Sequence, residues 1–73
     1  MLDEIQMHGE RQDRHPELSL VSLARAVEAD GRTLPPGAVG TVVHVYPGEG
    51  AYEIEFDRPF HIVATVAAAS IKE

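Results

Sequence analysis

The stretch that decides the fold is Pro35–Asp57, PPGAVGTVVHVYPGEGAYEIEFD. Residues 41–46, TVVHVY, are β-branched and aromatic and are typical of a strand. Residues 47–50, PGEG, have the composition of a tight turn, and from Tyr52 to Asp57 apolar residues alternate with acidic ones. The stretch therefore predicts a β-hairpin whose second strand turns its apolar side chains inward and its carboxylates outward.

The β pattern continues on the C-terminal side of the hairpin. After a turn at Asp57-Arg58-Pro59, apolar residues at every second position from Phe60 to Val66 predict another strand. Residues 67–70, AAAS, are too few for an independent helix and suit a single 3₁₀ turn. Ile71 then begins a short closing strand.

The segment before the hairpin, Leu18–Ala29, allows two interpretations. As a strand, it places Val21, Leu23 and Val27 on its inner face. As a helix, it places Leu20 on one face with Leu23 and Val27. We favour the strand because every downstream segment is β and a barrel needs a strand to close it.

The remaining segment, residues 30–37, is rich in glycine and proline and is predicted to be a loop. Leu34 is its apolar anchor, and we expect the loop to cap one end of the barrel. Gly37 and Gly40 lie where a small barrel bends sharply or where two backbones approach closely. Together the segments predict an all-β fold, a small and strongly bent antiparallel barrel of about five strands.

Several of these residues also carry a family resemblance: Val21, Leu23, Leu34, Gly37, Gly40 to Val43, Tyr46 and Ala51 to Phe56. In this pattern, over roughly Leu18–Ile71, the chain resembles DUF4926, a small bacterial family of uncharacterised function. The resemblance implies a fold and transfers no functional site. The pattern is similar, more loosely, to SH3-like barrels, which include Sm-like and KOW-type modules. The Arg-Gly loop of an Sm-type RNA binder is missing from this sequence.

The N-terminal extension, residues 1–17, differs in composition from the predicted barrel, residues 18–73. It is rich in charged residues and indicates a solvated tail, or a short helix or edge strand that uses Ile5 and Met7. Its start has neither the basic nor the apolar region of a signal peptide, and the sequence has no apolar stretch of about 20 residues. We therefore expect a cytoplasmic protein without a membrane partner.

Size and charge narrow the classes of function. A chain of 73 residues forms one domain and buries only about 60% of the surface that it exposes when unfolded. Without cysteine, disulfides are excluded, and association with another chain is the common remaining source of stability. Six basic against twelve acidic residues give a net charge of −6, which repels nucleic acids and anionic lipids.

Candidate site residues are few. Glu53, Glu55 and Asp57 project from one face of their strand as an acidic stripe. The stripe suits a divalent cation or a basic partner, or it is a solvated face that prevents aggregation. His44 and His61 would form a zinc site with Glu53 or Glu55 only if they met across strands. The sequence contains no catalytic, cofactor-binding or metal-binding motif, so we expect no enzymatic activity, no cofactor and no metal.

Apolar residues on both faces of the predicted strands are the most suggestive feature. A thin barrel buries only one face by itself, which predicts an interface at Val42, His44, Tyr46 and Val63. We therefore expect a non-enzymatic protein-interaction module. It either forms a homo-oligomer, namely a dimer, or binds another protein.

Two alternatives remain open. An Sm-like nucleic-acid-binding module would need the four basic residues outside the extension to converge on one surface: Arg25, Arg32, Arg58 and Lys72. An accessory or regulatory subunit of an enzyme or toxin system is equally compatible with the sequence.

Overall fold

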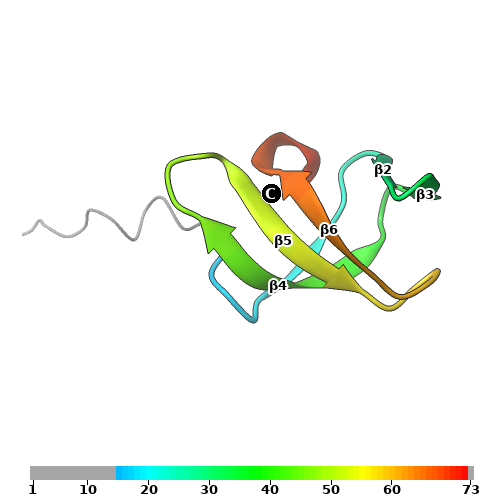
Figure 1. Cartoon of the computed structure of the whole chain (residues 1–73), viewed down its shortest axis with the longest axis horizontal. Coiled ribbons are helices and arrows are strands. Elements are labelled where there is room, and N and C mark those ends of the chain that lie inside the picture. The colour runs from blue at the N-terminus through cyan, green and yellow to red at the C-terminus, as the bar shows by residue number, and fades with distance from the viewer. Residues whose placement is uncertain (1–14, 73) are drawn as a thin grey trace, which may run out of the picture.

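The computed structural model describes residues 15–72, so the expectations for the N-terminal extension lie almost wholly outside the described residues. The elements in chain order are β1 (Leu20–Ser22), β2 (Val27–Ala29), β3 (Arg32–Leu34), β4 (Val39–Tyr46), β5 (Ala51–Phe56), β6 (Ile62–Ala67) and the 3₁₀ turn η2 (Ala68–Ser70). The strands form a four-stranded sheet, β1-β4-β5-β6, and a two-stranded sheet, β2-β3, both antiparallel (Figure 1). The predicted all-β fold is confirmed.

The hairpin of β4 and β5 forms as predicted, with one irregularity. Val42 pairs with Ile54, but the next aligned pair is His44 with Glu53, so Val43 is an extra residue in β4. Such a β-bulge shifts the following side chains by one position. Val43 and His44 are consequently both exposed, whereas strict alternation predicted that they lie on opposite faces.

The core lies on one face of the four-stranded sheet. Strand β5 alternates strictly, with Tyr52, Ile54 and Phe56 buried and the residues between them half-buried, as predicted. The buried hydrophobic residues are Val21, Leu23, Leu34, Val42, Tyr52, Ile54, Phe56, Ile62, Ala64, Val66 and Ile71. Each large side chain removed from water in this way contributes about 1.5–3 kcal/mol before the entropy of ordering it is counted.

Gly40 marks a close approach between β4 and β5. A Cβ atom at this position would lie 2.5 Å from Ile54 Cγ2 and 2.8 Å from the Glu55 carbonyl oxygen. Gly37 has a different role, because its φ of 88° needs glycine although no atom stands in the way of a side chain. Of the two explanations that the sequence offered, close approach applies to Gly40 and a sharp bend to Gly37.

The segment Leu18–Leu34 corrects two predictions. It is neither one strand nor a helix, because β1 ends at Ser22 and a separate hairpin of β2 and β3 follows. Part of the predicted loop is therefore a strand. Asp30 and Gly31 form its turn, with φ of 54° and 72°. Two consecutive positive φ angles at an Asp-Gly pair are typical of a type I′ hairpin turn, and this signal was present in the sequence. Leu34 is fully buried, as its role of anchor predicts.

The C-terminal residues join the two ends of the four-stranded sheet. Leu23 forms a β-bridge with Ile71. The Lys72 amide donates a hydrogen bond to the Ser22 carbonyl oxygen at 2.8 Å. The Ala24 amide donates a hydrogen bond to the Ser70 carbonyl oxygen, also at 2.8 Å. The predicted 3₁₀ turn and closing contact of Ile71 are thus present. The barrel is not fully closed, because within residues 15–72 no strand pairs with the second edge of β6. The described residues include no helix long and apolar enough to cross a membrane.

Candidate functional site

The face of the four-stranded sheet opposite the core, its outer face, presents the candidate functional residues. Strand pairing aligns Leu20, Thr41, Glu55 and Val63 in one row across the sheet. A second row contains His44, Glu53 and Thr65. Because β5 is an inner strand of this sheet, its carboxylates occupy the middle of the outer face, between apolar residues on β1, β4 and β6.

Glu53 is held by two neighbouring strands. Its Oε2 atom accepts hydrogen bonds from the Tyr46 hydroxyl at 2.8 Å and from Thr65 Oγ1 at 2.9 Å. The hydrogen bond to this carboxylate, together with desolvation and the negative charges of Glu53 and Glu49, raises the pKa of Tyr46 above its ordinary value. Glu53 therefore links β4, β5 and β6 across the outer face.

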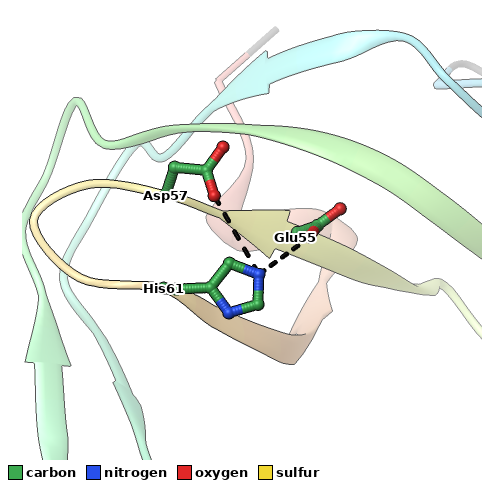
Figure 2. Close-up of side chains that lie close together, drawn as sticks. All are labelled: Glu55, Asp57 and His61. Carbon is green, nitrogen blue, oxygen red and sulfur yellow. Dashed lines mark hydrogen bonds and ion pairs between the residues drawn. The ribbon is translucent and has the colours of Figure 1, made fainter.

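Glu55 and Asp57 both contact a histidine, His61. The turn that follows β5 brings His61 back towards the end of the strand, and one nitrogen of its ring faces both carboxylates (Figure 2). His61 Nε2 is 2.8 Å from Glu55 Oε2 and 3.9 Å from Asp57 Oδ1. Each of the three residues offers one potential metal-ligating atom, and these three atoms all lie within 4.8 Å of one another. The acidic stripe predicted from the sequence is thus divided into a hydrogen-bonded Glu53 and a cluster of Glu55, Asp57 and His61.

His44 does not join this cluster. Its ring packs edge-on against Tyr46, with centroids 4.7 Å apart, and its Nδ1 atom lies 3.9 Å from Glu17 Oε2. His44 is aligned with Glu53, whereas His61 contacts Glu55. The zinc site considered from the sequence, which needed His44 and His61 together, is therefore not formed.

The four predicted interface residues do not all lie on one face of the sheet. Val42 is fully buried in the core, so its assignment to an exposed face is wrong. The bulge at Val43 places His44 and Tyr46 on the outer face without Val42, and no local sequence signal reveals it. Val63 is 50% exposed and lies on the same face, but on β6.

The two edge strands of the four-stranded sheet differ in a way that the sequence analysis missed. Strand β1 has three residues, and the C-terminal segment covers its second edge through the Leu23–Ile71 bridge and the Ser22–Lys72 hydrogen bond. Strand β6 has six residues, IVATVA, with neither charge nor proline, and in the described part of the chain its second edge pairs with no strand. Natural proteins usually protect such an edge with charges, prolines or a covering segment. The β6 edge is therefore a candidate interaction surface.

Among known protein families, the domain of unknown function DUF4926 matches residues 17–58. This match spans β1 to β5 and the turn after it, and includes Glu55 and Asp57 but not His61 or β6. No curated protein matches the sequence, and no solved structure matches it. Because the matched residues are more than half of the 73-residue chain, the protein belongs to the DUF4926 family.

Proposed function

We propose that this protein is a non-enzymatic interaction module that self-associates as a dimer, by antiparallel pairing of β6 with β6 of a second copy. The observation that carries the proposal is the second edge of β6, which has no strand partner among residues 15–72, is six residues long and has no charged side chain. The backbone N–H and C=O groups on such an edge form a template for another strand. Pairing with a second strand gives these N–H and C=O groups backbone hydrogen-bond partners.

The charges on the outer face favour the edge over the face as the interface. A dimer that stacked two outer faces would bury Glu53 and Glu55 of both copies near each other. Removing carboxylates from water without cationic partners costs several kcal/mol per ion. Edge pairing leaves both carboxylates in solvent, one strand away from the contact.

The partner is a second copy because a strand edge is complementary to itself under two-fold symmetry. Antiparallel pairing about an axis perpendicular to the sheet keeps the inner faces of both copies on one side. Any register that places a residue of β6 opposite itself meets this condition, and those with Ala64 opposite Ala64 or Thr65 opposite Thr65 pair the most residues of the strand. In either register the paired residues of β6 are uncharged, which limits the repulsion between two chains of net charge −6.

Sedimentation velocity with two matched variants tests the proposal. At tens of micromolar the wild-type chain should have at least twice its mass of 8.0 kDa. Val63→Lys places a charge beside the β6 edge and should shift the protein to monomer. Val39→Lys introduces the same charge at a similarly exposed valine, 54% against 50%, that lies away from this edge, and should leave the dimer intact.

Two outcomes would contradict the edge dimer. A wild-type protein that is monomeric across this concentration range has no such interface. Equal dissociation by Val63→Lys and Val39→Lys would place the contact on the outer face instead. Circular dichroism of each variant establishes that a loss of mass is not a loss of fold.

A further inference from the structure

We propose that Glu55, Asp57 and His61 form a surface site for a divalent transition-metal ion, with Zn²⁺ as the best match. The three side chains come from the end of β5, the following turn and the residue before β6, and they converge on one point of the outer face (Figure 2). The inference is independent of the proposed dimer, since it concerns side chains on the face and not the backbone edge.

The spacing of the ligand atoms fits one small ion. Ligands about 2.0–2.2 Å from a tetrahedral zinc ion lie roughly 3.3–3.6 Å from one another. His61 Nε2 is 2.8 Å from one carboxylate and 3.9 Å from the other, and all three ligand atoms lie within 4.8 Å. These distances bracket the required spacing. Asp57 and His61 are exposed, so their side chains can rotate to reach it without disturbing the core.

The chemistry of the donor set selects the ion. An imidazole nitrogen with two carboxylates is a ligand combination that zinc accepts, with water in the fourth position. Mg²⁺ and Ca²⁺ prefer oxygen ligands throughout and gain nothing from the imidazole. A divalent ion would also neutralise the two carboxylates that His61 now contacts. The ion replaces any proton on Nε2, so the ligating imidazole is neutral and carries its proton on Nδ1.

Calorimetric titration of ZnCl₂ into the full chain tests the site. The wild-type protein should bind one zinc ion at this site with a saturable isotherm, and MgCl₂ at the same concentration should give none. His61→Ala should weaken zinc binding at least about tenfold, since it removes one of three ligands. Glu53→Gln is the matched control, because this carboxylate is on the same strand but is occupied by Tyr46 and Thr65.

A second readout locates the ion. In ¹⁵N heteronuclear spectra, zinc should shift the amide signals of residues 55–58, 60 and 61 in the wild-type protein and in Glu53→Gln, but not in His61→Ala. An isotherm that does not saturate would overturn the proposal, as would binding that survives His61→Ala and is lost in His44→Ala. His61→Ala should lose zinc binding but keep the mass of the dimer in sedimentation velocity, because His61 lies before β6, so the zinc site and the dimer can fail separately.

Discussion

Strands β4 and β5 pair along their length, yet only β5 follows the alternation in its sequence. From Tyr52 to Phe56 the apolar residues of β5 occupy one face and the acidic residues the other, and burial follows that order. In β4 both faces carry apolar residues, and the bulge at Val43 decides which of them reach the core. The difference shows that alternation determines the buried face only where one of the two faces is polar.

The largest expected effect tests the face assignment in β4. Val42→Asp places a carboxylate without a partner in a fully buried position, and it should unfold the domain. Val43→Asp changes the neighbouring bulged residue, which is 38% exposed, and should alter the free energy of unfolding by only about 0.5 kcal/mol. Urea denaturation followed by circular dichroism measures both. If the two substitutions destabilised the domain equally, the assignment of a bulge at Val43 would be wrong.

The next effect tests the alternation in β5. Phe56→Ala removes a fully buried ring and should lower the free energy of unfolding by about 3–5 kcal/mol. Glu55→Ala should change it by only about 0.5 kcal/mol, because this carboxylate is on the outer face. Thermal denaturation in the presence of EDTA keeps any bound metal out of the comparison. A large loss in Glu55→Ala would instead show that the contact of this carboxylate with His61 stabilises the fold substantially.

A smaller effect tests the distance between the two strands. Gly40→Ala adds a methyl group 2.5 Å from Ile54 Cγ2 and 2.8 Å from the Glu55 carbonyl oxygen. The side chain of Ile54 can shift, but the backbone of β5 is fixed by strands on both sides. We expect a loss of about 1–3 kcal/mol, as for other overpacked sites. Unchanged stability in urea would mean that β4 and β5 are further apart at this point.

The smallest effect concerns the hydrogen bond that joins β4 to β5 on the outer face. The pKa of Tyr46 is raised, so its protonated form is favoured in the folded state. The stability that this bond contributes is present below the unfolded pKa of about 10 and is lost as the pH rises through the folded pKa. Ultraviolet titration of Glu53→Gln should show an earlier ionisation of Tyr46 than in the wild-type chain. Thr65→Val, which removes the other donor to Glu53, should keep the late ionisation.

The candidate sites show the limit of prediction from the sequence. The acidic residues of β5 were identified from their spacing, but the partner of each carboxylate was not. Tyr46 and Thr65 reach Glu53 from two adjacent strands, and His61 reaches Glu55 because the turn after β5 reverses the chain. The register between neighbouring strands sets which side chain lies opposite each carboxylate, and the sequence of one strand does not specify that register.

By itself, the sequence determined the all-β class, the hairpin, the inward face of β5 and the role of Ile71. Each of these depends on local composition: a period of two with one polar face, or a turn with glycine and proline. Only the tertiary structure decided that Val42 is buried, that β2 and β3 form their own hairpin, and that the β6 edge is left without a strand partner among the described residues. These features depend on contacts between residues far apart in the chain, and the pattern within one segment does not encode them.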